Sequence, residues 1–308
     1  MQTESDILVI GGGIAGFSAA LCAARQGFST HVLTGATLGG HLISIELIEG
    51  YPGFEEGIAG YDLCPIVQAQ ATEAGAGVAM AEATAIEQRD GLWHVASPAG
   101  DYVARAVILA TGTRLRSLNV PGEAQFVGKG VSHCASCDAP LLSGKPVIVV
   151  GGGDSAAQEA LFLAPYAASV TLVHQGAGLS CQRSFAERIE ATQTIETVPE
   201  ATVEAILGDE AVSGVRIVAG DGTTQEREAA GVFVYVGLAP NTQLFADIVE
   251  LSTDGRIRTD AVLATSAPNV FAAGTLRANS VGRAAAAAGE GTAAALAAAG
   301  RLVGPTTL

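Results

Sequence analysis

The stretch Asp6-Ile7-Leu8-Val9-Ile10-Gly11-Gly12-Gly13-Ile14-Ala15-Gly16 decides how this chain begins to fold. Its apolar first half is typical of a short, buried parallel strand, and an alanine-rich helical stretch follows it. The glycines at 11, 13 and 16 allow a tight turn, close approach of a pyrophosphate and close packing of the helix on the strand. The order of strand, turn and helix predicts a dinucleotide site whose phosphates lie against the helix N-terminus.

A second copy of this plan begins at residue 146. The run Pro146-Val147-Ile148-Val149-Val150 leads into Gly151-Gly152-Gly153-Asp154-Ser155-Ala156 and then into a helical stretch that reaches Leu163. Two such patterns in one chain predict two bound nucleotides, and the repetition is stronger support than either copy alone. The strand after each copy, residues 30–33 or 169–173, is not followed by the acid that usually holds a ribose hydroxyl.

The segments between and after the two glycine-rich copies are predicted to form further turns, strands and a helix. Turns are predicted at Gly39-Gly40-His41-Leu42 and at residues 48–53, where backbone amides could reach a cofactor ring. Residues 77–102 read as a small antiparallel sheet inserted between helical units, and residues 106–110 as a buried strand. The last strand is predicted at 270–274, and a helix from about Arg283 would point its first amides at the first cofactor.

A pair of thiols lies just before the second copy, in Cys134-Ala135-Ser136-Cys137-Asp138. Thiols at this spacing can close a small disulfide ring, and Asp138 offers a way to move the proton that the chemistry releases. A zinc site would need a second pair of ligands, but Cys22, Cys64 and Cys181 stand alone. We therefore predict a redox-active dithiol and no metal.

The amino-acid composition indicates which kinds of partner the protein can bind and in which cellular compartment it is expected. Of the 308 residues, 49% are hydrophobic, and 16 basic against 31 acidic residues give a net charge of −15, which disfavours nucleic acid and anionic membranes. Five cysteines do not make a disulfide framework, and no basic and apolar leader precedes the first strand. Glu290 and several glycines interrupt the alanine-rich run near the C-terminus, so we expect a packed helix there. The expectation is a cytoplasmic protein without nucleic acid or membrane partners.

In order and spacing, these motifs resemble the low-molecular-weight thioredoxin reductases over essentially the whole chain. The resemblance rests on both glycine-rich motifs, the second with Glu159, and on residues 39–42, 49–53, 110–112, 134–138, 237–242 and 271–274. It implies an α/β fold with two Rossmann-like domains of three-layer ββα type. A discontinuous FAD-binding domain, residues 1–113 and 243–308, would enclose a pyridine-nucleotide-type domain, residues 114–242, that carries the dithiol. It also implies a homodimer in which the inserted domain swings to turn the dithiol toward the flavin or the partner protein.

The resemblance also assigns residues to the site. It implies that Cys137 lies against the flavin, that Cys134 exchanges with the substrate and that Asp138 handles the proton. The residues expected to bind FAD are Gly11, Gly13, Ile14, Ala15, Gly16, Thr34, Gly39, Gly40, His41, Leu42, Gly50, Ala110, Thr111, Gly112, Gly274, Thr275, Arg283 and Ala284. Any NAD(P) would be bound by Gly151, Gly153, Asp154, Ser155 and Ala156.

The chain departs from the family where the electron donor would bind. NADPH-dependent members have a His-Arg-Arg stretch and a further Arg where this chain has His174-Gln175-Gly176 and Ser180, so the guanidinium groups that match a 2′-phosphate are missing. The acid that binds the ribityl chain of FAD is replaced by Thr275, whose hydroxyl can still hydrogen-bond a ribityl oxygen. Arg283 is expected near the flavin pyrimidine edge, where a cation would stabilise reduced flavin.

These features favour an FAD-dependent thiol–disulfide oxidoreductase that moves two electrons between the dithiol, the flavin and a second partner. Its substrate would be a disulfide or dithiol in a thioredoxin-like protein or a small molecule. The use of NAD(P)H stays open, with NADPH disfavoured. The alternatives without a pyridine nucleotide are a dithiol oxidase that uses oxygen and a reductase fed by ferredoxin or another flavin. A non-catalytic flavin-binding sensor is the alternative of another class, against which the intact Cys134, Cys137 and Asp138 argue.

Overall fold

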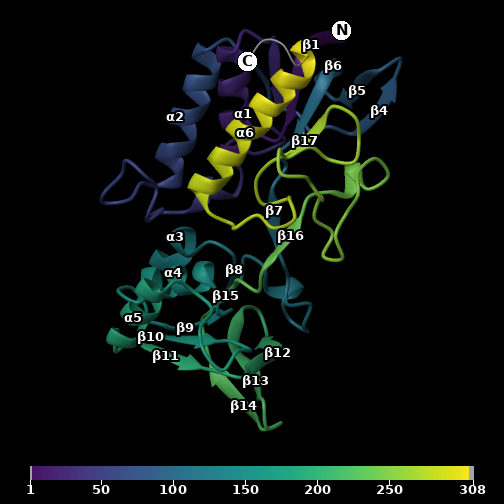
Figure 1. The fold of residues 1–308 in the computed structure, drawn as a ribbon. Coiled ribbons are helices and arrows are strands. Elements are labelled where there is room, and N and C mark those ends of the chain that lie inside the picture. The colour runs from purple at the N-terminus through teal and green to yellow at the C-terminus, as the bar shows by residue number, and fades with distance from the viewer. Residues whose placement is uncertain (1, 305–308) are drawn as a thin grey trace. The chain divides into compact units, whose positions relative to one another are not determined.

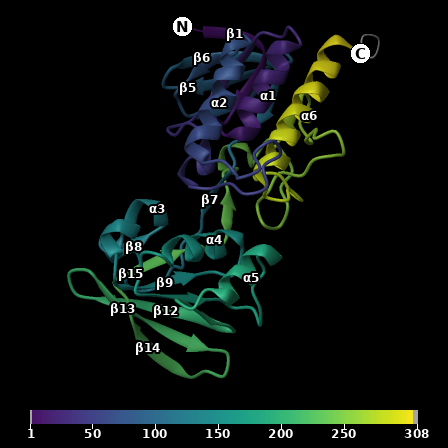
Figure 2. The same cartoon turned by 90° about the vertical axis from the view of Figure 1, so that its left-hand side faces the viewer.

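A computed structural model describes residues 2–304, which divide into two compact units (Figures 1 and 2). Unit 1 contains the chain up to Arg114 and again from Ala239 onward, and unit 2 is Leu115–Leu238. The assignment of FAD to a domain with limits at residues 113 and 243, and of a pyridine nucleotide to the segment between them, stays a prediction.

Unit 1 is built on a seven-stranded sheet. The path β3-β2-β1-β6-β5-β4 uses Gly77–Ala79, Thr30–Leu33, Gln2–Ile10, Gly100–Leu109, Leu92–Ser97 and Ala85–Arg89. Strand β17, Val270–Ala272, pairs in parallel with the second half of β6, while β5 pairs antiparallel with its first half. The small antiparallel sheet predicted at residues 77–102 is present in β4, β5 and the first half of β6, but the prediction is wrong for β3, which pairs in parallel with β2. Strand β6 begins at Gly100 and joins β4 and β5 to the main sheet, and β3 extends that sheet beside β2.

The two faces of this sheet follow from the alternation of side chains along β1. Ile7 and Val9 pack against the helices, whereas Leu8 and Ile10 pack against β5 and the segment that precedes β17. The helices of unit 1 are α1 (Ile14–Arg25), α2 (Gly60–Glu73) and α6 (Ala284–Val303), with 3₁₀ turns η1 (Gly40–Ser44) and η4 (Gln243–Phe245).

Helices α1 and α6 lie side by side at very short distance (Figure 1). A Cβ atom added at Gly291 would lie 2.0 Å from the carbonyl oxygen of Ala15, so this crossing tolerates no side chain. The alanine-rich composition of α6 thus reflects close packing inside unit 1, with Ala294, Ala295 and Ala298 fully buried. Within residues 2–304, no helix combines the length and apolar character needed to cross a bilayer.

Unit 2 repeats the layered plan. Its parallel sheet β11-β10-β9-β15-β8 consists of Ile195–Val198, Ser169–Val173, Pro146–Val150, Gly231–Val234 and Val131–Ser132. Helices α4 (Asp154–Leu163) and α5 (Arg183–Ala191) pack on Val147 and Val149 of β9, and Ile148 and Val150 face the opposite layer. That layer is the antiparallel sheet β12-β13-β14, formed by Ala201–Gly208, Val212–Ala219 and Thr224–Glu228. The predicted α/β fold with two Rossmann-like, three-layer halves is confirmed.

Short elements complete the chain. They are the helix α3 (Ala135–Asp138) and the 3₁₀ turns η2 (Ala124–Phe126) and η3 (Ala139–Leu142). Strands β7 (Thr113–Leu115) and β16 (Leu238–Pro240) form a two-stranded sheet where the chain leaves and re-enters unit 1. These two strands have three residues each, too few to show an alternating pattern in the sequence.

Candidate active site: two glycine-rich turns and a dithiol

The turn between β1 and α1 has room for a phosphate group because three of its residues lack side chains. A Cβ atom at Gly11 would lie 2.2 Å from the Ala110 oxygen, and one at Gly16 would lie 1.9 Å from the Gly11 oxygen. At Gly13 an added Cβ would meet no atom within 4 Å, so the surface above the turn is open. Gly13 is also the N-cap of α1 and brings no side-chain cap to the first amides of this 12-residue helix. This cradle fits the pyrophosphate of a dinucleotide.

Two neighbouring segments close around this turn. The Gly39 amide donates to the Gly12 oxygen at 2.9 Å, which places the loop before η1 beside the turn. Thr34, directly after β2, is buried against Gly12, where an added Cβ would lie 2.5 Å from the threonine Cβ. The structure thus brings the first glycine-rich motif together with the predicted residues Thr34, Gly39 and Gly40, and with Ala110, which directly follows β6.

The loop after β17 reaches the same turn through Gly274. An added Cβ there would lie 3.1 Å from the Cβ of Ala15, and the residue has a φ of 86°, which favours glycine. The Gly274 amide donates to Glu290 of α6 at 2.7 Å. Glu290 also forms a bidentate pair with Arg277, at 2.7 Å and 3.2 Å, and both side chains are about 15% exposed. This largely shielded ion pair, which has no local signal in the sequence, holds the loop in place.

Thr275, the predicted contact for the ribityl chain, makes a hydrogen-bond contact within the protein. Its hydroxyl lies 3.1 Å from the hydroxyl of Thr113, and a Cβ at Gly112 would lie 3.6 Å from the same oxygen. Thr111 donates to the carbonyl oxygen of Asn241 at 2.6 Å, and the Asn241 amide donates to the Gly112 oxygen at 3.0 Å. The predicted residues Thr111 and Gly112 are therefore hydrogen-bonded to Asn241, and Thr275 is hydrogen-bonded to Thr113, the next residue along the chain.

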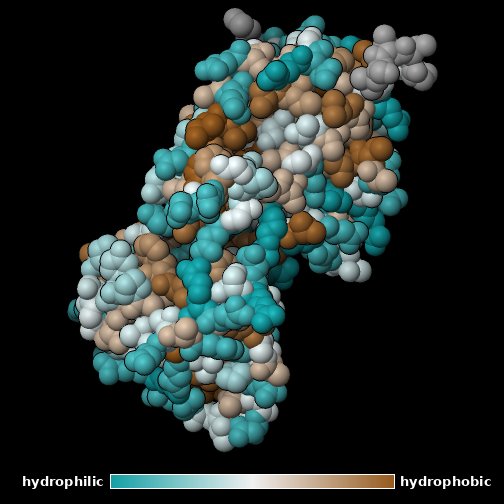
Figure 3. All heavy atoms as spheres, turned by 60° about the vertical axis from the view of Figure 1, so that its left-hand side comes forward, coloured by the Kyte–Doolittle hydropathy of each residue, from teal (hydrophilic) through white to brown (hydrophobic). Residues whose placement is uncertain are grey.

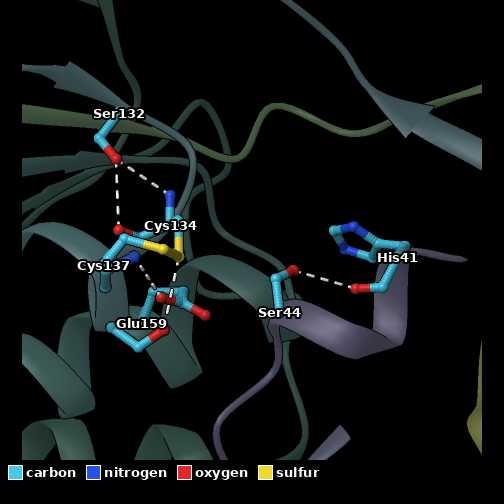
Figure 4. The surroundings of a disulfide bond; sticks show 8 residues. His41, Ser44, Ser132, Cys134, Cys137 and Glu159 are labelled. Carbon is cyan, nitrogen blue, oxygen red and sulfur yellow. Dashed lines mark hydrogen bonds between the residues drawn. A yellow bond between two sulfur atoms is a disulfide. The ribbon is translucent and has the colours of Figure 1, made fainter. Parts of the chain in front are cut away.

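Other predicted FAD residues lie outside this group of contacts. Gly50 is an exposed turn residue, and Arg283 is the exposed N-cap of α6, directly before Ala284. His41 has an exposed side chain on η1, and its carbonyl oxygen accepts a hydrogen bond from Ser44 at 3.1 Å (Figure 4). Leu42 lies on the same 3₁₀ turn and packs partly on the core of unit 1. Their contact with FAD stays a prediction.

The dithiol is present as a disulfide between Cys134 and Cys137, with their Cα atoms 5.4 Å apart (Figure 4). Cys134 precedes α3, where Ser132 Oγ accepts from its amide at 3.0 Å and donates to its carbonyl oxygen at 3.3 Å. The amide of Ala135 donates to Glu159 of α4 at 3.1 Å. A hydroxyl and a carboxylate therefore fix the start of the CxxC turn. Cys134 is half-buried and Cys137 is exposed.

Asp138 ends α3 directly after Cys137 and is half-buried. A carboxylate in this position is close in sequence and partly shielded from water, which suits it to move a proton at the dithiol. Glu159 was identifiable from the sequence only as part of the second motif, and Ser132 was not identified at all. A polar residue two positions before a CxxC is a signal that could have pointed to Ser132.

The remaining cysteines, Cys22, Cys64 and Cys181, carry free thiols. Burial raises the pKa of the Cys64 thiol to about 11, which keeps it protonated and unreactive near neutral pH. Among residues 2–304, no three His, Cys, Asp or Glu side chains gather as metal ligands would.

The second glycine-rich turn, between β9 and α4, has the same build as the first. A Cβ at Gly151 would lie 2.3 Å from the Tyr235 oxygen, whereas one at Gly153 would meet nothing within 4 Å. Gly153 is the N-cap of the ten-residue helix α4 and provides no side-chain cap. Asp154, Ser155 and Ala156 form the first turn of that helix. This cradle too fits a pyrophosphate.

The segment after β10 folds back on this second turn. The amide and hydroxyl of Ser180 both donate to the Gly152 oxygen, at 2.8 Å and 3.1 Å, and the Gln182 amide donates to Asp154 at 2.7 Å. His174 is buried beneath Gly152, and burial lowers its pKa, so the ring is neutral at pH 7. Arg183 is the one arginine or lysine in residues 174–183, and it pairs with Glu187 at 2.6 Å. This segment therefore offers a 2′-phosphate no cluster of cations.

A family model described as pyridine nucleotide-disulphide oxidoreductase matches residues 5–291 of the chain. The chain belongs to this family. Thioredoxin reductase from Treponema pallidum is 39% identical over 300 residues, which cover 97% of both chains. The prediction of a thioredoxin reductase-like flavin disulfide oxidoreductase is confirmed at the level of the family.

Solved structures of the family have the same fold. Thioredoxin reductase from Lactococcus lactis, in its FR conformation, superimposes with a TM-score of 0.94 at 31% identity and covers 97% of this chain and 99% of its own. Thioredoxin reductase from T. acidophilum gives a TM-score of 0.94 at 34% identity, covering 98% and 99%. Membership of the family implies FAD, and the open cradle at Gly13 fits its pyrophosphate.

Proposed function

We propose that this chain is an FAD-dependent thiol–disulfide oxidoreductase of the thioredoxin reductase type. The observation that carries the proposal is the disulfide between Cys134 and Cys137 at the start of α3, in a chain that also has two open glycine-rich turns. The proposed substrate is the disulfide of a thioredoxin-like protein, because the relatives at this level of identity are named thioredoxin reductases.

The proposed reaction transfers two electrons through the pair Cys134 and Cys137 to the substrate disulfide. Two electrons and two protons convert the disulfide into two thiols, and bound FAD supplies the capacity to store those electrons. The Cys134 thiolate then attacks one sulfur of the substrate disulfide and displaces the other as a thiolate that takes up a proton. Cys137 attacks the resulting mixed disulfide, which re-forms the internal bond and releases the reduced substrate. Asp138 is proposed to accept and return the proton, and Cys137 to be the thiol that faces the flavin.

The proposed FAD site is the first glycine-rich turn with the loops around it. The backbone of residues 11–16 would hold the pyrophosphate, and residues 110–112 and 274–275 would hold the rest of the cofactor. The fixed hydrogen bonds among Thr111, Thr113, Thr275 and Asn241 support this assignment, because a preformed polar loop binds without a large ordering cost.

The proposed electron donor is not NADPH. The segment that follows β10 has Gln175, Gly176 and Ser180 at the positions of the family's arginines, and Ser180 is already bonded to Gly152. A neutral surface cannot repay the desolvation of a 2′-phosphate dianion. A ferredoxin-type or flavin-type donor is a further alternative. The experiment below separates NADH from a dithiol that passes its electrons to oxygen.

The proposed assembly is a homodimer in the cytoplasm. Unit 1 exposes large apolar side chains in and before α2, namely Leu47, Phe54, Tyr61 and Ile66, each between 37% and 50% exposed. Figure 3 shows hydrophobic residues in several small patches among hydrophilic ones on the part of the surface next to the grey terminal residues. The proposal rests on the grouping of the four exposed apolar residues in one stretch of the chain, since contiguous apolar surface is what binds another protein chain.

The test is anaerobic stopped-flow reduction of the purified yellow protein. NADPH, NADH and a small dithiol are mixed separately with the wild type, with Cys134→Ser and with Cys22→Ser as the matched control. We expect the dithiol to bleach the flavin in the wild type and in Cys22→Ser but not in Cys134→Ser, and NADPH to bleach it slowly if at all. Equal bleaching of Cys134→Ser and Cys22→Ser would contradict the dithiol mechanism, and fast bleaching by NADPH would contradict the choice of donor.

Recovery of the yellow colour in air, after reduction by the dithiol alone, would make the chain a dithiol oxidase. Rapid bleaching by NADH would make it an NADH-dependent reductase. The absence of bleaching by any donor would leave a flavin-binding sensor.

A further inference from the structure

Ser136 lies between the two cysteines of the CxxC turn, and its hydroxyl contacts one of the two sulfur atoms. The Oγ of Ser136 is 3.4 Å from the Sγ of Cys134, and both residues are half-buried. The Cys134 sulfur has no proton while it is bonded to Cys137, so the Ser136 hydroxyl is the donor in this contact. A serine in the first turn of a helix commonly bonds to a nearby backbone group, whereas this one bonds to the sulfur.

The two sulfur atoms therefore have different surroundings. The main chain of Cys134 is held by Ser132, whose hydroxyl accepts from its amide and donates to its carbonyl oxygen. Cys137 is exposed, and no side chain among residues 2–304 donates a hydrogen bond to its sulfur. Two serines thus hold the same cysteine, one at its main chain and one at its sulfur.

The carboxylates around the turn oppose the formation of a thiolate. Glu159 of α4 accepts the Ala135 amide at 3.1 Å, and Figure 4 shows its carboxylate directly beside the disulfide. Asp138 is the last residue of α3. Negative charges so near to a thiol favour its protonated form. A thiolate at this turn therefore needs a donor that offsets them.

Two other titratable groups face the turn. The Nδ1 atom of His133 donates to the Val234 oxygen at 3.1 Å. Tyr235 packs in the same core as Ala135, and burial raises the pKa of its phenol far above the usual value, so the phenol is neutral. The side-chain donor that contacts the sulfur itself is the hydroxyl of Ser136.

We propose that Ser136 is a catalytic residue of the dithiol, because its hydroxyl stays on the Cys134 sulfur after reduction and stabilises the thiolate that attacks the substrate disulfide. The inference rests on the proposed function and deepens it, since it names the group that makes Cys134 the attacking thiol.

The step is balanced at the sulfur atoms. Two electrons and two protons break the bond between Cys134 and Cys137 and give two thiols. The Cys134 thiol releases its proton to solvent, and the thiolate accepts the hydrogen bond from Ser136. The thiolate then forms a bond to one sulfur of the substrate disulfide, and the other sulfur leaves as a thiolate that takes up a proton.

The experiment measures the alkylation of one active-site thiol at a time. The full-length holoprotein with Cys137→Ala is reduced and treated with iodoacetamide from pH 5 to pH 10, and mass spectrometry follows the label on Cys134. Alkylation forms a sulfur–carbon bond and releases iodide, so its rate reports the thiolate fraction. In this background we compare Ser136→Ala with Ser136→Thr, which keeps a hydroxyl, and with Ser169→Ala, which removes an exposed hydroxyl from the same unit.

We expect Ser136→Ala to raise the midpoint of Cys134 labelling by about 0.5–1 pH unit, the net size of one hydrogen bond. Below the midpoint, this shift slows labelling by about three- to tenfold. Ser136→Thr and Ser169→Ala should keep the midpoint of the parent protein. An unchanged midpoint in Ser136→Ala, or a raised one in Ser136→Thr, would overturn the inference.

The reverse background separates a bond to one sulfur from a general effect on the turn. In protein with Cys134→Ala, Ser136→Ala should leave the labelling midpoint of Cys137 unchanged, because the hydroxyl does not contact that sulfur. A shift at Cys137 equal to the shift at Cys134 would mean that Ser136 acts through the structure of the turn, which contradicts the inference. Thermal unfolding of each variant confirms that the compared proteins are folded.

The inference and the proposed function fail in different experiments. If Ser136→Ala shifts the midpoint of Cys134 but a dithiol does not bleach the flavin of the wild type, only the proposed function fails. If the flavin is bleached and Ser136→Ala leaves the midpoint of Cys134 unchanged, only the inference fails.

Discussion

Replacing Glu290 with Gln is expected to destabilise unit 1 by about 2–3 kcal/mol. The carboxylate accepts the Gly274 amide at 2.7 Å and two guanidinium nitrogens of Arg277 at 2.7 Å and 3.2 Å. Each hydrogen bond to a charged group contributes about 1.5–3 kcal/mol, and a glutamine oxygen can keep roughly one of the three. The two lost bonds would together contribute about 3–6 kcal/mol. Because both side chains are still about 15% exposed, water replaces part of this loss and brings the expected destabilisation to about 2–3 kcal/mol.

The assay is thermal unfolding of the purified protein with bound flavin. A loss of this size in a domain of this length lowers the melting temperature by about 5–10 °C. Glu187→Gln is the matched control, because the ion pair of Glu187 with Arg183 is exposed and joins residues four positions apart on one helix. An exposed pair of this kind stabilises a helix by about 0.3–0.5 kcal/mol. Equal shifts for Glu290→Gln and Glu187→Gln would refute the reasoning that burial gives the Arg277 pair its importance.

Three further outcomes follow from the site. Gly16→Ala should abolish flavin retention, measured by absorbance after desalting, because the new Cβ would lie 1.9 Å from the Gly11 oxygen; a yellow variant would argue against the cradle. Cys64 should resist iodoacetamide at pH 8 and react increasingly as the pH rises toward its pKa of about 11, as followed by mass spectrometry; rapid labelling at pH 8 would mean that the thiol is not buried. Replacing Gln175, Gly176 and Ser180 by Arg should speed flavin reduction by NADPH about tenfold or more relative to NADH, by adding charge-assisted hydrogen bonds to the 2′-phosphate; an unchanged ratio would mean that these positions do not contact it.

The parts of the fold that were predictable from sequence are those that rest on local constraints. Strands at residues 30–33, 146–150 and 169–173 appear at the predicted positions, since short apolar runs beside glycine-rich turns have few other structures open to them. Gly11 and Gly151 were identifiable because only glycine adopts their φ angles of 125° and 140° while touching a neighbouring carbonyl.

The features that sequence analysis missed depend on contacts between distant residues. The joining of the antiparallel segment to the parallel strands of unit 1 was not predictable, because the pairing of β6 with both β1 and β5 leaves no local signal. The pair of Arg277 and Glu290 spans thirteen residues across a loop and a helix, and the hydrogen bond from the Ala135 amide to Glu159 requires α3 to lie next to α4. Charge and burial of this kind appear only once the chain is folded.

The most direct test of the central claim is an anaerobic titration of the purified protein with dithionite, which counts electrons against the flavin absorbance. If the disulfide of Cys134 and Cys137 exchanges electrons with the bound cofactor, complete reduction of the wild type will consume about four electrons per flavin, two for each centre. The variant Cys134→Ser with Cys137→Ser will consume about two, because only the flavin remains. A wild type that needs only about two electrons would contradict the account.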